Sequence, residues 1–406
     1  MSKKIFIIIS AVLTLFLLSL LGYYFLIKDN TGSTGGIVSG FKSFFPFGGD
    51  DPETLATTTE MTDNDNQPIG DQSFGQKLRK ISDLPVSGAG TLDVKAGTII
   101  RYIEKATGHI YEVEMFSPNR NRISNTTIPR AYDAVWGNKN NSLMARYLKD
   151  DDQTVDTYSL TLTATSTATE NTIAGIIFTD NITDVSVYGS SVFFLVKNPD
   201  SSSGFISNFD GSKKKQVWNS DIKELSSQYI DEKTIALTTR PAQNVPGFLY
   251  LVNTTNGGVK KALGDISGLS ANISPDSSKI IYLEQVEDAY TTVYDLKTKI
   301  YTPTTPVTFP EKCAWSKKDK DIVYCAVPKE VIDGSSLTSW YKGEISYTDD
   351  IWKFDTKNNT SSRIEGLSEE GIGKIDLIKP ILSENEQYLI FINKIDNSLW
   401  SLDLTK

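Results

Sequence analysis

Three aromatic residues in one long loop are the side chains best suited to recognise a partner. The segment from Pro328 to Asp350 reads PKEVIDGSSLTSWYKGEISYTDD and contains Trp340, Tyr341 and Tyr347 without a helical or strand periodicity. Tryptophan and tyrosine provide a large contact area at a small entropic cost, and binding residues concentrate in loops. We expect them to cap or recognise a ligand. The alternative is that they only pack the loop onto its neighbour.

A second loop presents a positive charge. Arg240 lies in the segment TTRPAQNVPG, residues 238–247, which contains two prolines. A guanidinium group binds a carboxylate or a phosphate through two parallel hydrogen bonds. Arg240 is therefore a candidate binding residue, and the alternative is an ion pair with a neighbouring acid.

Two further arginines, Arg101 and Arg146, share an Arg-Tyr-aliphatic context. A buried guanidinium needs a partner, so we expect these side chains to pair with local carboxylates such as Glu104 or Asp151. The alternative is a cluster of arginines that binds a substrate.

Catalytic and metal-binding patterns are weak. His109 is the single histidine, it has no nucleophile motif near it, and the serine-hydrolase pattern G-x-S-x-G does not occur. The adjacent residues Asp349 and Asp350 are the carboxyl groups best placed for glycoside cleavage, although adjacent acids on a loop are more often solvated. We predict no catalytic residue, no cofactor and no metal site.

The two cysteines fall in one predicted hairpin, EKCAWSKKDKDIVYCAV. The register that pairs Trp315 with Val323 also places Cys313 opposite Cys325, at the short end of the distance that a disulfide spans. This register predicts a disulfide, which an extracytoplasmic location would favour. The alternative is two free buried thiols.

Most of the chain repeats one pattern, a turn followed by a β-branched and aromatic strand. A period of about 40 to 50 residues with four strands in each unit is typical of a β-propeller. Seven repeats predict seven blades, and the longest interval contains the aromatic loop, an insertion between the second and third strands of blade six. The equivalent strand positions are Arg101, Arg146, Leu195, Thr238, Leu283, Cys325 and Ile392.

The last repeat lacks a fourth strand because it stops at Lys406. The segment QKLRKISDLPV, residues 76–86, resembles the fourth strands of other repeats. We therefore expect it to complete the last blade and to close residues 76–406 into one all-β domain, with no edge left open between blades.

The first residues have a different composition. Residues 1–28 contain a basic start, Lys3 and Lys4, and an uncharged run from Ile5 to Ile27. At about 1.5 Å for each residue, this run is long enough to cross a membrane core of about 30 Å. The basic start favours the cytoplasmic side, which predicts a single-pass anchor with the propeller outside the cytoplasm. The alternative is a cleaved signal peptide, although small residues are lacking where cleavage would occur.

Residues 29–75 are rich in Gly, Ser, Thr, Asp and Asn, a composition that predicts a flexible linker, and the aromatic stretch from Phe41 to Phe47 interrupts it.

The chain carries a formal net charge of -9, spread along its length. An excess of negative charge argues against nucleic acid as a partner, since binding to phosphates requires a basic surface.

The turn sequences resemble those of TolB-like, WD40-like (PD40) propeller repeats. The matching phrases are SPD at 274–276, SEN at 383–385, WSKKD at 315–319 and NFDGS at 208–212, and Ser277 stands where the commonest form of the motif has glycine. The resemblance implies a propeller outside the cytoplasm. It implies no activity, because such propellers serve as scaffolds, binding domains and gates on peptidases.

Together these patterns predict a membrane-tethered propeller that binds or scaffolds a protein of the cell envelope. The alternative is a hydrolase or lyase that acts on an envelope polysaccharide at the mouth of the propeller channel. Carboxyl groups with raised pKa values clustered at the channel would favour the enzyme, and an apolar or aromatic rim would favour binding.

Overall fold

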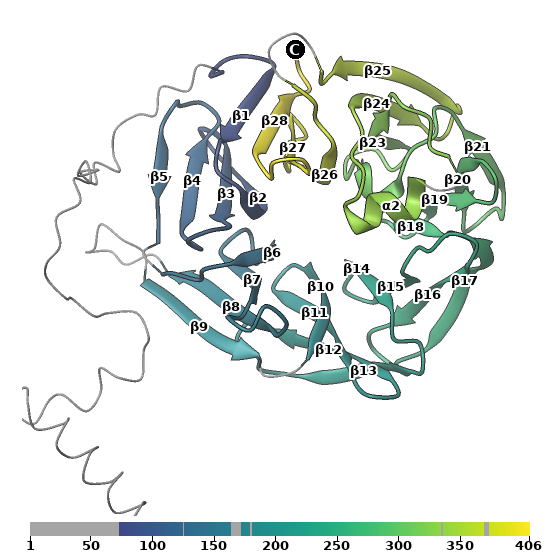
Figure 1. Ribbon diagram of the computed structural model, residues 1–406, viewed down its shortest axis with the longest axis horizontal. Helices are drawn as coiled ribbons and strands as arrows, with labels where there is room; N and C mark the ends of the chain where they lie inside the picture. Colours follow the sequence, from purple (N-terminus) through teal and green to yellow (C-terminus); the bar gives the residue numbers. More distant parts are fainter. Residues whose placement is uncertain (1–72, 125, 164–171, 179–180, 334–335, 369–372) are drawn as a thin grey trace, which may run out of the picture. The chain divides into compact units, whose positions relative to one another are not determined.

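The computed structural model describes residues 73–406, apart from 125, 164–171, 179–180, 334–335 and 369–372. Within them the chain forms seven four-stranded antiparallel sheets arranged as a ring, which confirms the predicted seven-bladed β-propeller (Figure 1). The predicted anchor, residues 1–28, and nearly all of the predicted linker lie outside the described residues. No helix among residues that the structure describes is both long and apolar enough to cross a membrane.

Each blade is a meander whose first strand lines the centre of the ring and whose fourth strand lies at the perimeter. Blades one to three consist of β2 (Val86–Val94), β3 (Gly97–Glu104), β4 (Ile110–Glu114) and β5 (Arg120–Arg122); β6 (Ala131–Gly137), β7 (Ser142–Leu148), β8 (Val155–Thr163) and β9 (Thr172–Phe178); and β10 (Ile182–Tyr188), β11 (Ser191–Lys197), β12 (Ser202–Asn208) and β13 (Lys215–Ser220).

Blades four to seven follow the same order, except that the last blade takes its fourth strand from the beginning of the domain. They consist of β14 (Leu225–Asp231), β15 (Thr234–Thr239), β16 (Pro246–Asn253) and β17 (Val259–Ser267); β18 (Ser270–Ile273), β19 (Lys279–Gln285), β20 (Ala289–Asp295) and β21 (Tyr301–Thr304); β22 (Cys313–Trp315), β23 (Ile322–Pro328), β24 (Asp349–Asp355) and β25 (Thr360–Gly366); and β26 (Leu377–Leu382), β27 (Tyr388–Asn393), β28 (Leu399–Asp403) and β1 (Leu78–Ser82).

Strand β1 closes the ring. It pairs antiparallel with β28, Leu78 opposite Leu402 and Lys80 opposite Trp400, so the two ends of the domain lie side by side (Figure 1). Leu78 and Ile81 are buried, and Ile81 packs with residues of blades seven and one. The last blade therefore has a complete outer strand.

Adjacent blades bury apolar faces against each other. Phe193 of blade three packs with Leu237 of blade four, and Ile103 of blade one packs with Leu143 of blade two. Because strands buried on both faces leave little surface for polar side chains, the strands read as β-branched and aromatic runs in the sequence. Every blade depends on both neighbours.

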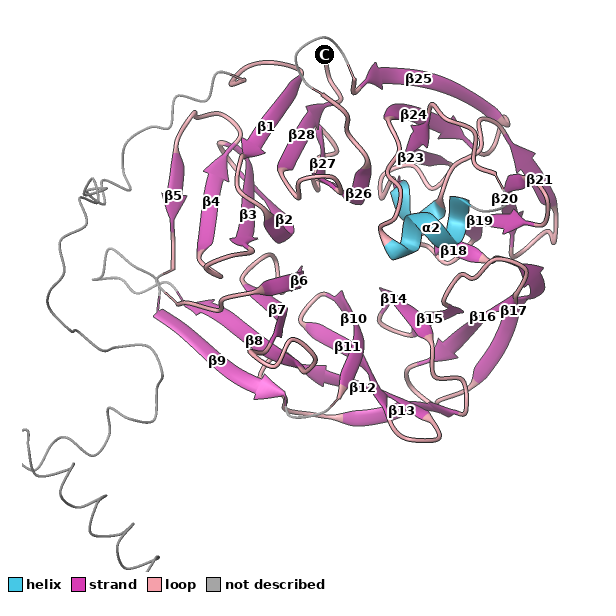
Figure 2. Ribbon diagram, in the orientation of Figure 1, coloured by secondary structure: helices cyan, strands magenta, loops and turns pink. Residues whose placement is uncertain are grey.

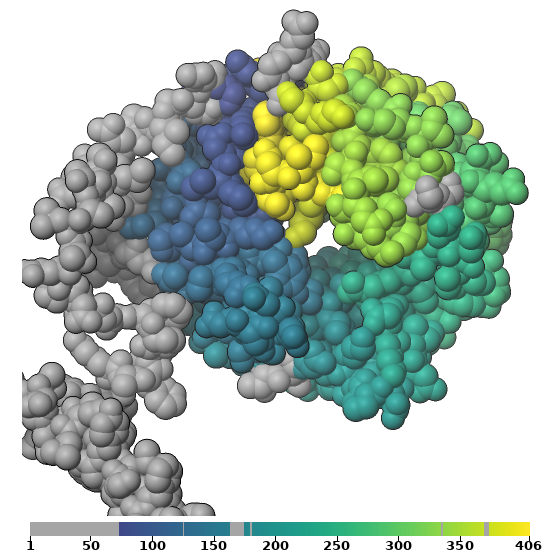
Figure 3. Space-filling model, in the orientation of Figure 1, coloured from purple at the N-terminus to yellow at the C-terminus, as the bar shows by residue number. Residues whose placement is uncertain are grey.

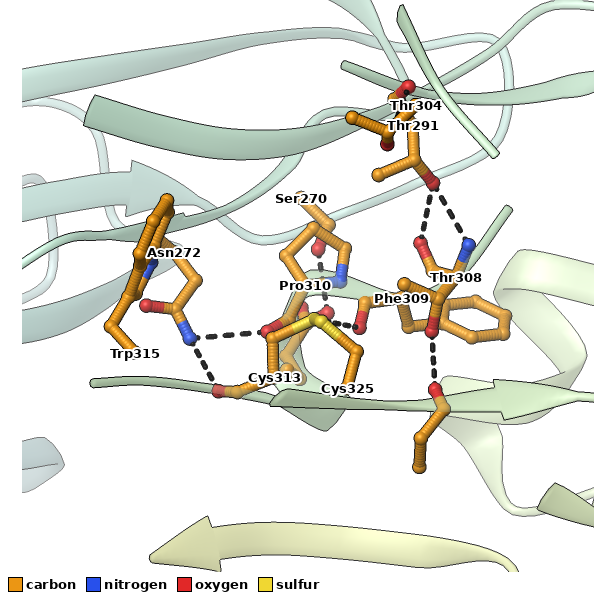
Figure 4. Close-up of a disulfide and its surroundings, with 12 residues drawn as sticks. Ser270, Asn272, Thr291, Thr304, Thr308, Phe309, Pro310, Cys313, Trp315 and Cys325 are labelled. Carbon is orange, nitrogen blue, oxygen red and sulfur yellow. Dashed lines mark hydrogen bonds between the residues drawn. A yellow bond between two sulfur atoms is a disulfide. The ribbon is translucent and has the colours of Figure 1, made fainter. Parts of the chain in front are cut away.

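The predicted disulfide between Cys313 and Cys325 is present. The two residues oppose each other in the β22–β23 ladder, with Cα atoms 4.0 Å apart. Figure 4 shows the bridge beside the short turn at Pro310, where the Asn272 amide of blade five donates to the Pro310 and Cys313 carbonyl oxygens at 3.1 and 2.9 Å. The bridge joins the first two strands of blade six, and the Asn272 bonds hold the first of these strands against blade five.

We expect the closing strand to determine the stability of the domain. A chain that starts at Leu84 lacks β1 and exposes the edge of β28, whereas a chain that starts at Ser73 retains the strand. Losing two buried aliphatic side chains and a ladder of hydrogen bonds should cost about 5 kcal/mol. The shorter chain should melt about 10 °C lower in a thermal unfolding experiment. Equal melting temperatures for the two chains would contradict this role of β1.

Candidate binding site at the rim of the propeller

The loops between second and third strands lie at one end of the ring, together with the loops that connect one blade to the next. We call this end the loop rim. It carries the β7–β8 loop, the β15–β16 loop with Arg240, and the insertion of blade six between β23 and β24. The insertion contains helix α2 (Ser336–Lys342), which Figure 2 shows beside the central opening.

The aromatic residues of the insertion pack inward. Trp340 is buried, stacks on Phe309 with ring centroids 4.6 Å apart, and donates from Nε1 to Oδ2 of Asp376 at 2.9 Å. Tyr347 is also buried, 5.6 Å from the Phe309 ring centroid. Tyr341 retains an exposed edge, and its hydroxyl is hydrogen-bonded to Glu311. Of the three candidate aromatic residues, Tyr341 alone presents surface to a partner.

A buried charge cluster holds the insertion in place. Lys312, Asp349 and Asp376 are all fully buried, and the Lys312 ammonium lies 2.6 Å from a carboxylate oxygen of each acid. The ammonium also lies 5.2 Å from the centroid of the Trp340 ring. Burial raises the pKa of Asp349 to about 6, although the attraction of Lys312 opposes the rise.

The expected solvation of Asp349 and Asp350 is therefore wrong. Asp349 belongs to the buried cluster, and Asp350 is buried next to Arg363 at 2.8 Å and Lys329 at 3.2 Å. Strand β24 starts at Asp349, and both acids are buried in the blade. Each carboxylate is therefore paired with a cation. The sequence carries no signal for the cluster, since Lys312 and its two acids are far apart along the chain.

Arg240 lies at the end of β15, and its side chain is 49% exposed. Its Nε lies 3.7 Å from Oε2 of Glu224, and its Nη2 donates to the Thr183 carbonyl at 3.3 Å. Glu224 makes a closer contact, 2.6 Å, with the Lys197 ammonium. The predicted alternative, a pairing with a neighbouring acid, is present, but the contact is long and shared.

Arg146 reaches the same region from blade two. Its side chain is 14% exposed, its Nη1 lies 3.6 Å from Oδ2 of Asp133, and its Nη2 donates to the Ile182 carbonyl at 3.4 Å. Asp133 is directly opposite Arg146 in the β6–β7 ladder, whereas the expected partner Asp151 caps its own exposed loop. Arg146 and Arg240 thus approach two consecutive carbonyl groups, those of Ile182 and Thr183.

Arg101 does not reach this region, although it lies on the second strand of its blade, as Arg146 does. It pairs with Glu112, the residue opposite it on β4, at 2.8 Å. The expected partner Glu104 is three residues along the same strand, and residues an odd number apart on a strand point to opposite faces. Nη1 of Arg101 donates to the Asn140 carbonyl and to the Asn141 side chain, at 2.9 and 2.7 Å. Arg101 is structural.

Between blades two and four the loop rim is hollowed into an open pocket of about 620 Å³, which we call the arginine pocket. Both Arg146 and Arg240 line it. The full lining is Arg146, Gln153, Thr154, Val155, Asp156, Asn181, Ile182, Thr183, Glu224 and Arg240.

The central channel forms a second cavity, of about 890 Å³, and Figure 3 shows the opening in the middle of the ring. At the loop rim, the wall of this channel includes Asp133 and Lys379. The Lys379 ammonium lies 2.5 Å from Oδ1 of Asp133. Apolar and aromatic residues such as Trp136 and Tyr229 line it farther down.

Two carboxyl groups on the innermost strands of blades two and three, Asp133 and Asp184, have pKa values shifted in opposite directions. Burial raises the pKa of Asp184 on β10 to about 6, against hydrogen bonds from the Ser227 amide and hydroxyl. Burial also acts on Asp133, but Lys379 and Arg146 outweigh it and hold the pKa of Asp133 below its usual value. Across the part of the chain that the structure describes, no three His, Cys, Asp or Glu side chains are grouped as they would be to hold a metal ion.

Comparisons with known proteins show the fold. No family model and no curated protein matches the sequence. A solved oligogalacturonate lyase in complex with manganese is 11% identical over 80% of this chain and 98% of that chain, with a TM-score of 0.50. The lyase from Vibrio parahaemolyticus is 9% identical over 79% and 97%, with a TM-score of 0.48. TolB from Acinetobacter baumannii is 13% identical over 78% and 63%, with a TM-score of 0.38. At these identities the likeness concerns the propeller architecture alone.

Replacing Lys312 by methionine tests the buried cluster. The change removes the ammonium between two buried carboxylates and leaves Asp376 only the Lys394 ammonium at 3.8 Å, so the free energy of unfolding at pH 8 should fall by about 3–5 kcal/mol. Protonation of Asp349 relieves this repulsion. Its pKa in the folded protein is already raised above the usual 3.8, and it should rise further in the variant, so the loss should shrink between pH 8 and pH 5.

Urea unfolding of Lys312→Met at both pH values measures this difference. Lys342→Met is the matched control, because that lysine is exposed on α2 and should change stability by less than about 0.5 kcal/mol. A loss that is equal at the two pH values would contradict the assigned electrostatics.

Proposed function

We propose that the protein is a protein-binding module whose arginine pocket recognises carboxylates on an acidic segment of its partner. One observation carries the proposal: Arg146 and Arg240, from two different blades, line the same open pocket, and neither holds its own acid closer than 3.6 Å. A pair of arginines that served only to stabilise the fold would make close, saturated ion pairs, as Lys312 does.

The donors of these arginines are incompletely used. A guanidinium has five N–H groups in a planar fork. Nε of Arg146 is buried and has no hydrogen-bond partner among the described residues, and the contacts of its two Nη atoms are long, at 3.4 and 3.6 Å. Arg240 shares Glu224 with Lys197, which contacts the other carboxylate oxygen at 2.6 Å, and the contact of Arg240 itself is long, at 3.7 Å. A ligand carboxylate that bridges the two guanidinium groups would gain charge-assisted hydrogen bonds that the protein does not make itself.

We further propose that residues 5–27 anchor the protein in a membrane and that residues 29–75 tether the propeller outside the cytoplasm. The run of 23 uncharged residues after a basic start supports the anchor. The Cys313–Cys325 disulfide supports an oxidising compartment, because cytoplasmic thiols are kept reduced. The partner would then be a protein of the cell envelope.

Binding of a labelled peptide with four glutamates tests the carboxylate proposal, with the glutamine version of the peptide as the ligand control. The glutamate peptide should bind at least tenfold more tightly. Arg240→Ala should weaken its binding about tenfold or more, since charge-assisted hydrogen bonds contribute about 1.5–3 kcal/mol. Arg240→Lys should recover only part of the loss, because an ammonium lacks the planar fork.

Lys320→Ala is the matched protein control. That residue is an exposed cation in the β22–β23 turn, at the opposite end of the ring, and its loss should leave peptide affinity unchanged. Equal weakening by Lys320→Ala and Arg240→Ala would show attraction to overall charge and would overturn the proposal.

A second candidate function is a lyase or hydrolase acting on an acidic envelope polysaccharide at the channel mouth. The observation that favours it is the pair Asp133 and Asp184, since carboxyl groups with diverging pKa values can divide the roles of base and acid. Asp184 would act as the acid and would lose its proton as the pH rises through about 6. Turnover of oligogalacturonate that falls above this pH and vanishes in Asp184→Asn would favour the enzyme over the binding module.

A further inference from the structure

The seven fourth strands form the perimeter of the propeller, and within the described residues each presents a row of backbone groups without a neighbouring strand. Exposed edges invite pairing with another chain, and proteins protect them with charges, proline, bulges or short strands. Six of the seven edges contain lysine, arginine or proline. They are β1 (LRKIS), β5 (RNR), β13 (KQVWNS), β17 (VKKALGDIS), β21 (YTPT) and β25 (TSSRIEG).

Strand β9 of blade two has none of these protections. Its sequence, TIAGIIF, contains no charge and no proline, and its seven residues pair with β8 without a register shift. The ladders of β1, β13, β17 and β25 each contain a bulge or irregularity, and β5 and β21 are only three and four residues long. Strand β9 is thus a regular and uncharged edge.

The apolar side chains of this edge are exposed. Ile176 is 38% and Ile177 is 49% exposed, and because they are consecutive they cover opposite faces of the sheet. A strand added beside β9 would therefore cover apolar surface on both faces and satisfy the unpaired backbone groups of the edge.

We propose that β9 pairs antiparallel with β9 of a second copy of this chain, so that two blades join into one eight-stranded sheet. The distribution of charge over the perimeter strands favours a contact through β9. The chain carries a net charge of -9, which opposes self-association, and β9 is the one perimeter strand at which two copies meet without bringing charges or proline together. The neighbouring turn carries one acid, Asp210, and two lysines, Lys213 and Lys214.

The sequence of β9 is also complementary to itself. An isologous pair about a twofold axis at Gly175 places Ala174 opposite Ile176 of the second copy, a small residue against a large one. The two copies of Gly175 face each other on the axis, where the absence of side chains lets the backbones approach. Thr172 and Phe178 would form the outermost pair. The sequence TIAGIIF therefore suits pairing with itself in this register.

This interface is separate from the arginine pocket, because no residue of β9 lines the pocket. The proposal does not rest on the proposed function. A dimer formed through blade two would present two arginine pockets to a partner, and avidity would raise its apparent affinity.

The mass of the full-length chain, purified in mild detergent and measured by analytical ultracentrifugation, tests the dimer. The wild-type protein should sediment as a dimer. Ile177→Lys places a charge on the edge and should halve the mass. Val259→Lys is the matched control, because Val259 is a 51% exposed apolar residue on the β17 edge, and this variant should remain a dimer.

A cysteine cross-link tests the register independently of charge. The two native cysteines are joined to each other, so Gly175→Cys adds one reactive thiol. Its Cβ would lie 2.8 Å from the end of the Leu160 side chain, which can move, and 3.4 Å from the Ser159 carbonyl oxygen, an ordinary contact. Oxidation should yield covalent dimers of Gly175→Cys and none of Val259→Cys.

A monomeric wild-type chain without cross-linking of Gly175→Cys would overturn the proposal. A wild-type monomer that loses binding of a different protein upon Ile177→Lys would also overturn it, in favour of a heterologous strand on β9. Dimers that survive Ile177→Lys would place the interface elsewhere and would equally contradict it.

Discussion

The pairing of β1 with β28 is the constraint on which the rest of the propeller depends. Each blade buries one face against each of its two neighbours, so an open ring would leave apolar faces exposed. Closure also fixes the inner strands, which are joined by polar side chains from blade to blade. The Gln228 side chain donates to the Ile273 carbonyl at 2.8 Å, and the Lys379 ammonium donates to the Ser87 carbonyl at 2.9 Å. Rim residues from distant parts of the chain therefore hold fixed positions.

Charged groups at the loop rim fall into two kinds. Lys312, Asp349 and Asp376 are fully buried and saturate one another, which fits a role in fixing α2 on the propeller. Arg146 and Arg240 line an open pocket, and their contacts with acids are long. The aromatic insertion is therefore a packed structural element, because the buried cluster holds it. The two arginines retain hydrogen-bond donors for a ligand, because their own contacts with acids are long.

The fold was predictable because its signals are local and repeated. Seven turns followed by seven apolar strands determine the number of blades, and the hairpin register that aligns Trp315 with Val323 places Cys313 opposite Cys325. The site was less predictable because it depends on contacts between blades. Nothing near Lys312 in the sequence indicates its two acids, which lie 37 and 64 residues farther along the chain. Nothing distinguishes Arg146, which reaches the pocket, from Arg101, which does not. The acidic partners of Arg101 and Arg146 are the residues opposite them on the neighbouring strand. Spacing along a single strand does not reveal which residues lie opposite.

A crystal structure of the protein with the four-glutamate peptide tests the central claim most directly. The account predicts a peptide carboxylate between the guanidinium groups of Arg146 and Arg240, within hydrogen-bonding distance of both. A peptide bound along the channel wall at Asp133 and Lys379 instead, with the arginine pocket empty, would contradict it.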